Sequence, residues 1–282
     1  MSFAHPEVLV ETSWVEDHIN DSTVRIIEVD YNPENAYNQG HIKNAGLVWW
    51  KREINDPVRR DIINTKQFEE LMGKLGIIPD TTLVLYGDFN NWFAAFALWV
   101  FKYHQHQDVR IMNGGRKKWE AEQREYVNNE PKFQPVKYIA KSPNETIRAY
   151  LSDVRKIIDI KDPKWGLVDV RSPKEYAGEI TAPSEYPTEH AQRGGHIPGA
   201  ANIVWSQAVN DDGTFKSFEE LNTLYQSKGI IPDKNIITYC RIGERSSHTW
   251  FVLKYLLGYQ NVKNYDGSWT EWGNMIRNPI EK

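Results

Sequence analysis

An internal repeat constrains the fold of this 282-residue chain more than any other feature. The Gly-Ile-Ile-Pro-Asp sequence at residues 76–80 returns unchanged at 229–233, which is an offset of 153 residues (76 to 229). The Gly-His-Ile motif at residues 40–42 likewise returns at 195–197. Two further matches keep the same order, Phe-Glu-Glu-Leu at 68–71 and 218–221, and the pairs Gly114/Trp119 and Gly267/Trp272. The chain therefore consists of two copies of one domain.

Each copy alternates predicted strands with predicted helices. The predicted strands lie at 24–29, 46–49, 82–86 and 109–112 in the first copy, and at 167–170, 202–205, 236–239 and 262–265 in the second. Helical patterns at 65–75 and 217–228 precede the shared Pro-Asp turn. This alternation predicts an α/β fold with a parallel sheet that helices cover on both faces. Such sheets bind ligands just beyond the carboxyl ends of their strands.

The stretch between the two copies is polar and contains prolines, which is typical of a linker that crosses a protein surface. We therefore predict a first domain at 1–127, a linker at 128–147 and a second domain at 148–282. The second copy also contains a polar insertion at 178–194. The sequence leaves open whether this insertion covers the site or is an excursion without a role.

Composition excludes several classes of function. The net charge is −4, with 40% hydrophobic and 26% charged residues, so the chain is typical of a soluble globular protein and lacks the basic excess of a nucleic-acid binder. It shows neither a signal sequence nor an apolar run long enough to span a bilayer. One cysteine rules out a disulfide framework, and no other cluster has metal-ligand spacing. We expect a cytoplasmic protein without a metal, another cofactor or a membrane partner.

The one cysteine, Cys240, lies between the strand at 236–239 and a helical pattern at 249–257. Backbone N–H groups at such a junction are unpaired, and Arg241 and Arg245 add positive charge. Both effects favour the thiolate, so we expect the thiol to ionise easily. The pattern predicts a nucleophilic cysteine in a pocket for a small dianion.

The first copy keeps the frame of this loop without its chemistry. At the repeat offset, the cysteine and its two arginines fall opposite Gly87, Asp88 and Trp92. That loop would be acidic and apolar. We therefore expect the chemistry in the second copy alone, and we expect the first copy to close one side of the cleft.

These motifs resemble those of the two-domain rhodaneses, which are thiosulfate sulfurtransferases, over nearly the whole chain. The resemblance rests on the tandem copies, on Val-Asp-Val-Arg at 168–171, on Gly-His-Ile-Pro-Gly-Ala at 195–200 and, most specifically, on the cysteine loop at 240–246. It implies two tandem rhodanese-like domains. Each would have a mainly parallel five-stranded sheet with helices on both faces, and the first domain would lack the cysteine.

The resemblance also implies residue roles. Cys240 would carry sulfur as a persulfide, and Arg245, Arg241 and Arg171 would bind the substrate. Some family members carry a lysine two positions after the cysteine, where this chain has Ile242, so the arginines would have to supply the positive charge. A curled loop also binds anions through its backbone N–H groups, here those of Ile242, Gly243, Glu244 and Ser246.

The implied reaction has two half-reactions. The Cys240 thiolate would attack the outer sulfur of thiosulfate and release sulfite, and cyanide, a thiol or a dithiol would then remove the sulfur. A protein sulfur acceptor is a further option. We predict that Cys240→Ser abolishes transfer. We also predict that Arg245→Ala weakens thiosulfate use far more than it changes folding.

Structural roles are the alternatives for the residues around the cysteine. Cys240 could be an inert buried residue, and Arg241 and Arg245 could be ordinary surface charges. Arg171 could pair with Asp169 or Glu175.

Histidines and Glu244 also have structural alternatives. A histidine occupies the same position of the Gly-His-Ile motif in both copies, as His41 and as His196. This recurrence favours a structural role in the turn. His248 could form a Cys–His pair, but no orienting partner is evident. Glu244 is more readily explained as a solvent-facing loop residue than as a residue that tunes acceptor choice.

Rival functions differ in the loop they need. Mercaptopyruvate sulfurtransferases resemble a Cys-Gly-Ser/Thr-Gly loop with fewer cations. Cysteine phosphatases resemble Cys-x5-Arg, whereas four residues separate Cys240 from Arg245 here. A sulfur carrier without turnover, or a binding module, is a candidate from another class.

Overall fold

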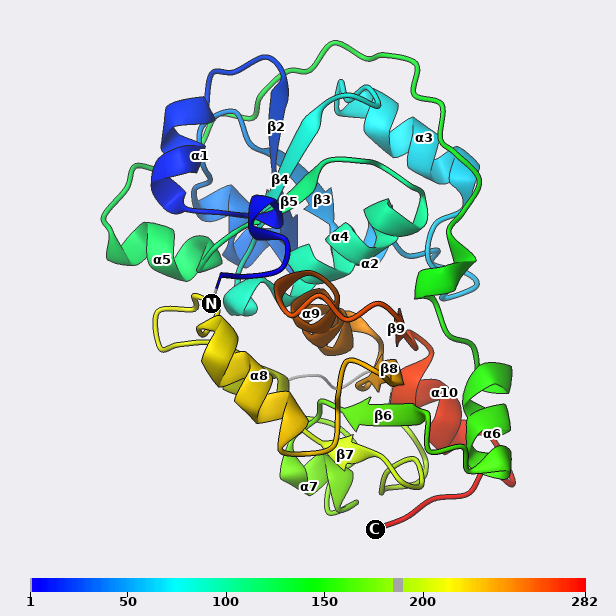
Figure 1. Ribbon diagram of the computed structural model, residues 1–282. Coiled ribbons are helices and arrows are strands. Elements are labelled where there is room, and N and C mark those ends of the chain that lie inside the picture. The colour runs from blue at the N-terminus through cyan, green and yellow to red at the C-terminus, as the bar shows by residue number, and fades with distance from the viewer. Residues whose placement is uncertain (1, 185–189) are drawn as a thin grey trace. The chain divides into compact units, whose positions relative to one another are not determined.

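The computed structural model describes residues 2–184 and 190–282, which fold as two compact units (Figure 1). The N-terminal unit comprises Glu7–Asn144 and Val209–Phe215. The C-terminal unit comprises the described residues of 2–6, 145–208 and 216–282. Each unit contains one copy of the sequence repeat, apart from two short segments: residues 2–6 of the first copy belong to the C-terminal unit, and residues 209–215 of the second copy belong to the N-terminal unit.

The N-terminal unit contains a five-stranded parallel sheet in the order β1-β5-β4-β2-β3. Its strands are β1 (Leu9–Val10), β2 (Val24–Asp30), β3 (Gly46–Trp49), β4 (Thr82–Tyr86) and β5 (Val109–Met112). Its helices are α1 (Thr12–His18), α2 (Trp50–Glu53), α3 (Thr65–Lys74), α4 (Trp92–Tyr103) and α5 (Gly115–Ala121). Val15 on α1 and Trp119 on α5 join one hydrophobic cluster with residues of β2 and β4, while α4 is buried along nearly its whole length. Alternating strands and helices therefore produce the predicted α/β layers.

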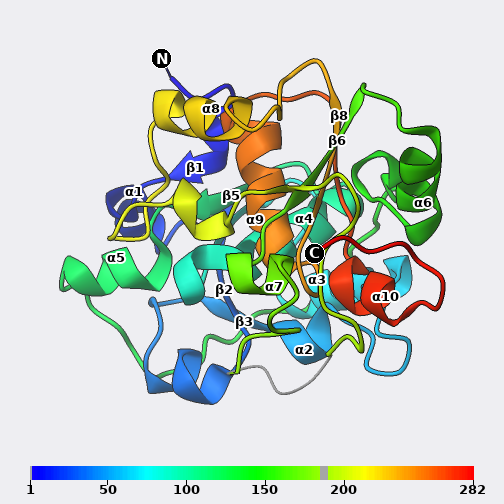
Figure 2. The same ribbon diagram turned by 90° about the horizontal axis from the view of Figure 1, so that it is seen from below.

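The C-terminal unit contains a four-stranded parallel sheet in the order β7-β6-β8-β9. Its strands are β6 (Trp165–Asp169), β7 (Ala201–Asn202), β8 (Asn235–Tyr239) and β9 (Val262–Asn264). Its helices are α6 (Leu151–Ile160), α7 (Pro173–Tyr176), α8 (Phe218–Gln226), α9 (Glu244–Phe251) and α10 (Ser268–Asn274). Figure 2 shows α9, which follows the cysteine loop, as one of the central helices of this unit.

The prediction of two parallel α/β sheets is confirmed, but the second sheet has four strands where five were expected. In the N-terminal unit the fifth strand is β1, which pairs with β5 over two residues. Its counterpart in the C-terminal unit is a single parallel bridge between Arg148 and Asn264. One bridge does not make a strand, although Ala149 N still donates to Asn264 O at 2.9 Å.

Two elements differ from the sequence-based expectation by three residues or more at one end, and the others by no more than two residues. The strand expected at 202–205 ends at Asn202, because Trp205 begins a 3₁₀ turn that runs to Ala208. The helix expected at 249–257 begins five residues earlier, at Glu244, and continues as a π-helical turn over Val252–Leu256. The cysteine loop is therefore shorter and tighter than the hydrophobic pattern indicated.

The predicted linker runs over the surface of the N-terminal unit as far as Asn144 and is mostly exposed. Several contacts attach it; for example, Val136 N donates to Gly73 O at 3.0 Å, and the buried Tyr138 hydroxyl lies 2.8 Å from His106 Nδ1. Of the insertion at 178–194, residues 185–189 lie outside the described residues. None of the helices in the described part of the chain has the length and apolar character that crossing a membrane requires.

Candidate active site

Cys240 directly follows the carboxyl end of β8, and a tight loop leads from it into α9. Gly243 ends this loop with φ 100°, and a Cβ there would lie 2.9 Å from the Cα and Cβ atoms of Asp266. Both facts require glycine at this position. As a result, Gly243 N donates to Cys240 Sγ at 3.1 Å. The backbone N–H groups of Ile242 and Ser246 act on the same sulfur and lower its pKa. The loop therefore surrounds Sγ with N–H donors.

The Gly243 peptide is held in place by a network of three side chains. Its carbonyl oxygen accepts hydrogen bonds from Ser247 Oγ at 2.7 Å and from Asn264 Nδ2 at 3.3 Å, and Ser246 Oγ lies 3.1 Å from it. Ser246 Oγ also donates to Asn264 Oδ1 at 2.7 Å. Because the carbonyl is fixed on one side, the N–H of the same residue stays directed at the sulfur.

The electrostatic environment of Cys240 differs from the sequence-based expectation. The residue is fully buried, and this burial raises the pKa of its thiol; the Glu244 carboxylate raises it further. Arg245 and the loop N–H groups act in the opposite direction but do not outweigh burial. The expectation that the thiol ionises easily was wrong for the free protein. Sequence position alone identified the N–H donors and arginines, but it did not reveal the desolvation.

Arg245 forms a buried ion pair with a carboxylate. Its Nη1 and Nη2 atoms each lie 3.0 Å from an oxygen of Glu175, which is fully buried on α7. Burial by itself would raise the pKa of Glu175, but the Arg245 charge and hydrogen bonds, with the Ser172 N–H, bring it below its usual value. Truncating Arg245 would leave a buried carboxylate unpaired. The expected small effect of Arg245→Ala on folding therefore does not fit the structure.

Arg171 is also paired, in the way that the structural alternative proposed. Its Nε and Nη2 atoms donate to the two oxygens of Asp169 at 3.0 and 2.6 Å, and Nη2 also donates to Gly195 O at 2.7 Å. Its guanidinium lies 4.5 Å from the centre of the Trp269 ring. Nη1 is buried and has no hydrogen-bond partner among the described residues. That nitrogen is therefore the one part of the guanidinium that contacts neither Asp169 nor Gly195.

The N-terminal unit contains an arginine with the same contacts. Arg116 Nη1 donates to Glu28 Oε1 at 2.5 Å and to Gly40 O at 2.9 Å. Gly40 begins the first Gly-His-Ile motif, as Gly195 begins the second. Glu28 pairs with Tyr86 in the sheet, as Asp169 pairs with Tyr239. In both units, then, a guanidinium joins a strand carboxylate to the Gly-His-Ile turn.

The two arginines come from different sequence positions. Arg116 stands at the repeat offset from Trp269, whereas the N-terminal counterpart of Arg171 is Asp30. A guanidinium thus occupies the same place in the copy without a cysteine. This recurrence shows that the arginine stabilises the turn whether or not the unit can do chemistry.

The loop of the N-terminal unit is acidic instead of cationic. Burial raises the pKa of Glu28 to about 8, of Asp88 to about 7 and of Asp30 to about 6. The Asp30 charge adds to the rise at Glu28 and Asp88, while Arg116 opposes it at all three carboxyls. This loop therefore offers buried carboxyls, which the raised pKa values keep partly neutral, where the cysteine loop offers arginines. In the described part of the chain, no group of three His, Cys, Asp or Glu side chains is placed to hold a metal ion.

Ser268 belongs to the site, and the motif-based search did not identify it. Its Oγ accepts a hydrogen bond from Cys240 N at 3.1 Å and donates to Tyr265 O at 2.7 Å. The residue has φ 51°, a conformation that costs energy for any residue with a Cβ. At the repeat offset, the N-terminal unit has Gly115 with φ 55°. A serine where the sister copy has glycine was the signal that could have revealed it.

The remaining residues that the sequence singled out near the cysteine are all buried. Arg241 and Glu244 are buried in the loop, with 2% and 3% of their surface exposed. The prediction that Glu244 faces solvent was therefore wrong. Its Oε2 atom lies 3.4 Å from Cys240 Sγ. His248 is buried edge-on against Trp205, and burial lowers its pKa to about 3, so it is neutral and unsuited to holding a thiolate as an ion pair.

The repeated histidines lie in the turns, as their recurrence suggested. His196 stacks on Tyr176 with ring centres 3.5 Å apart, and its Nδ1 lies 3.0 Å from Tyr176 O. His41 stacks on Tyr37 in the same way, with ring centres 3.7 Å apart. Each histidine thus packs on a tyrosine within its own unit, which is consistent with a structural role in the turn.

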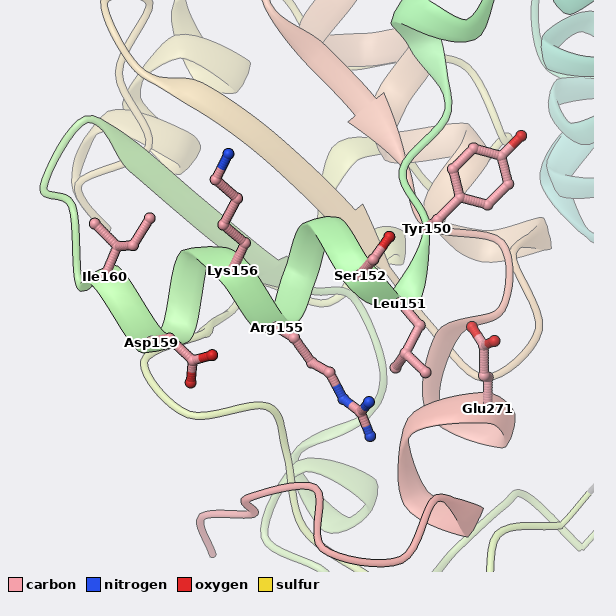
Figure 3. A pocket seen from close by; sticks show the side chains of 8 residues that line it. All are labelled: Tyr150, Leu151, Ser152, Arg155, Lys156, Asp159, Ile160 and Glu271. Atoms are coloured by element: carbon pink, nitrogen blue, oxygen red, sulfur yellow. The ribbon is translucent and has the colours of Figure 1, made fainter.

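A groove follows α6 in the C-terminal unit (Figure 3). Leu151 and Arg155 project from α6 on the side where Glu271 of α10 lies, and Lys156 points the other way. Arg155 is engaged with Asn278 Oδ1 at 2.6 and 2.8 Å. None of the residues predicted for the site lines this groove.

Together, the fold and the site define a tandem α/β protein in which one copy presents a cysteine within a ring of backbone N–H donors. The chain belongs to the rhodanese-like domain family, whose model matches residues 11–122 and 151–275. The predicted family is thereby confirmed.

Relatives cover the chain almost completely. It is 57% identical to "Sulfur carrier protein TtuD" of Thermus thermophilus, over 100% of this chain and 99% of that protein. It is 50% identical to a "Putative thiosulfate sulfurtransferase" of Mycolicibacterium smegmatis, over 99% of both chains.

Solved structures share the fold at lower identity. An anaerobic ergothioneine biosynthesis enzyme from Chlorobium limicola, in complex with trimethyl histidine, matches with a TM-score of 0.86 and 26% identity, over 99% of this chain and 71% of that one. A structure of EanB with a cysteine persulfide and ergothioneine matches with a TM-score of 0.88, 26% identity and the same coverage.

Proposed function

We propose that this protein is a thiosulfate sulfurtransferase that carries sulfur as a persulfide on Cys240. The observation that carries the proposal is the loop around Sγ, with Gly243 N at 3.1 Å and the N–H groups of Ile242 and Ser246 directed at the same atom. Such donors stabilise a negative persulfide and the charge that develops as it forms. The position at the carboxyl end of β8 is where parallel sheets bind ligands.

In the first half-reaction, the Cys240 thiolate attacks the outer sulfur of thiosulfate. A new S–S bond forms at the cysteine, the S–S bond of thiosulfate breaks, and its electron pair leaves with sulfite. In the second half-reaction a nucleophile attacks the outer sulfur of the persulfide and regenerates the thiolate. Two half-reactions through a covalent intermediate give ping-pong kinetics.

Substrate binding would combine the loop N–H groups with the arginines. We propose that Arg241 and the Nη1 atom of Arg171 bind the anionic sulfur donor, thiosulfate. Arg245 would act mainly through its charge near the sulfur, because both of its terminal nitrogens contact Glu175. We place the reaction in the cytoplasm, where a free thiol persists.

A second candidate is a sulfur carrier that passes its persulfide to a protein instead of cyanide or a small thiol. The observation in its favour is the name of the Thermus thermophilus relative, which shares 57% of its residues with this chain. The chemistry at Cys240 is the same in both cases, and the two differ in whether multiple turnovers occur with a small acceptor. 3-Mercaptopyruvate remains the alternative sulfur donor.

The lone cysteine makes the test direct. Intact mass measured after thiosulfate treatment should show a gain of one sulfur atom, which Cys240→Ser should abolish. Steady-state formation of thiocyanate from thiosulfate and cyanide should exceed that from mercaptopyruvate. Sulfur loading without turnover would favour the carrier, whereas absence of loading in the wild-type protein would refute both candidates. Hydrolysis of phosphate esters would instead indicate a cysteine phosphatase.

A further inference from the structure

The thiol of Cys240 has a carboxylate as its hydrogen-bond acceptor. Sγ donates to Glu244 Oε2 at 3.4 Å while it accepts from Gly243 N at 3.1 Å. Cys240 is fully buried, and Glu244 is 3% exposed. Glu244 lies at the start of α9, and its other oxygen is 3.8 Å from Arg245 Nε. The proton of the thiol is therefore already directed at a basic oxygen inside the loop.

The negative charge of Glu244 affects how easily the Cys240 thiolate can form. A thiolate beside an ionised carboxylate would place two negative charges side by side in a buried loop, and the sulfur donor would add two more. If the proton moves from Sγ to Glu244, the pair keeps a total charge of −1 before and after thiolate formation. The attacking sulfur then meets the anionic substrate beside a neutral carboxyl group instead of a charged one.

Other charged groups surround the pair. Arg245 on α9 and Glu175 on α7 form their own ion pair, and Arg241 lies in the loop. Asp266, which precedes α10, is paired with Arg148 at 2.7 Å. His248 on α9 is neutral. The arginines stay charged throughout the physiological range, so they do not accept the proton.

We propose that Glu244 accepts the Cys240 proton when the thiolate attacks and returns it after the sulfur has left. This inference rests on the proposed function and assigns a proton-transfer role within the same site.

In the first half-reaction, the S–H bond breaks and a new O–H bond forms at Glu244 Oε2. The electron pair left on Sγ makes the bond to the outer sulfur, and sulfite leaves with the pair from the broken S–S bond. When an acceptor nucleophile takes the outer sulfur, the Sγ–S bond breaks and its electron pair returns to Sγ. The proton then moves back from Glu244, so protons and electrons balance over the cycle.

Alkylation of the lone cysteine tests the coupling without any sulfur chemistry. In Glu244→Gln, the negative charge that opposes thiolate formation is absent. We expect iodoacetamide to react about tenfold faster at a pH of about 7, with the pH profile displaced to lower pH by about one unit. Glu179→Gln, which removes an exposed carboxylate just after α7, should match the wild-type protein. Coincident profiles for Glu244→Gln and wild type would overturn the coupling.

The pH dependence of sulfur loading tests the proton transfer itself. Initial loading by thiosulfate, followed by quenched reaction and intact mass, should change by less than about twofold between pH values of about 6 and 8 in the wild-type protein, because the proton stays within the site. In Glu244→Gln the proton must first reach solvent, so loading should rise by up to about tenfold per pH unit until the thiol is ionised. Equally flat loading in both proteins would refute the role.

Two further results separate this role from a structural one. Glu244→Asp keeps a carboxylate, and its loading should depend on pH less steeply than that of Glu244→Gln; an equally steep dependence would count against proton transfer. Failure of wild-type loading would refute the proposed function, whereas the alkylation comparison would still decide whether Glu244 is coupled to Cys240.

Discussion

The pairing of Arg245 with Glu175 makes a quantitative prediction about folding. Both oxygens of Glu175 lie 3.0 Å from Arg245, and the two side chains are 0% and 6% exposed. Removing one member of a buried ion pair leaves the other charge without compensation, at a cost of about 3–5 kcal/mol. Arg245→Ala should therefore lower the free energy of unfolding of the C-terminal unit by about that amount. The activity of this variant would then reflect a destabilised unit as well as a missing charge.

Urea unfolding followed by tryptophan fluorescence measures this effect. With a slope of about 2 kcal/mol per molar urea, the loss corresponds to a midpoint lowered by about 2 M for the transition of the C-terminal unit. The control is the double variant Glu175→Gln/Arg245→Met, which removes both charges and should recover much of the stability, because replacing a buried pair by uncharged groups is often nearly neutral. A midpoint for Arg245→Ala that equals that of the wild-type protein would refute the reasoning.

Three further predictions follow from other contacts. Arg116→Met should destabilise the N-terminal unit by about 3 kcal/mol without changing the amount of sulfur loaded on Cys240, as measured by urea unfolding and intact mass; reduced loading would contradict a purely structural role. The lowered pKa of Glu175 means that its pair stabilises the protein above the unfolded-state pKa of about 4 and loses this contribution as the pH falls, so Glu175→Gln should flatten the acid limb of a stability profile. Ser268→Gly should slow sulfur loading by about fivefold through loss of the bond to Cys240 N, while unfolding free energy stays within about 1 kcal/mol because backbone strain is relieved; unchanged loading would remove Ser268 from the site.

Much of the architecture follows from local patterns in the chain. The repeat announced two similar units, and strands such as β4 and β5 begin and end where their apolar runs do. These features are predictable because strand formation and turn placement depend on neighbouring residues. The position of Cys240 after β8 was predictable for the same reason, and so was the absence of a thiol from the sister loop.

Pairing between distant residues was not predictable in the same way. Arg245 and Glu175 are 70 positions apart, and Arg116 reaches Glu28 across 88 positions. The sequence motif assigned Arg245 to the substrate, whereas in the folded chain Arg245 forms an ion pair with Glu175. The same holds for Glu244, which has a loop position typical of an exposed residue but is buried against the sulfur.

The primary structure thus established that one of two copies holds a cysteine at a strand end, since repeats, periodicity and residue identity are written along the chain. Folding established the charge and protonation state around that cysteine. Both depend on desolvation and on which opposite charge lies within a few ångströms, and these are properties of packing between segments that are remote in sequence. For this reason the candidate nucleophile could be predicted from one strand and one loop, while the side chains that contact its thiol became known only from the folded unit.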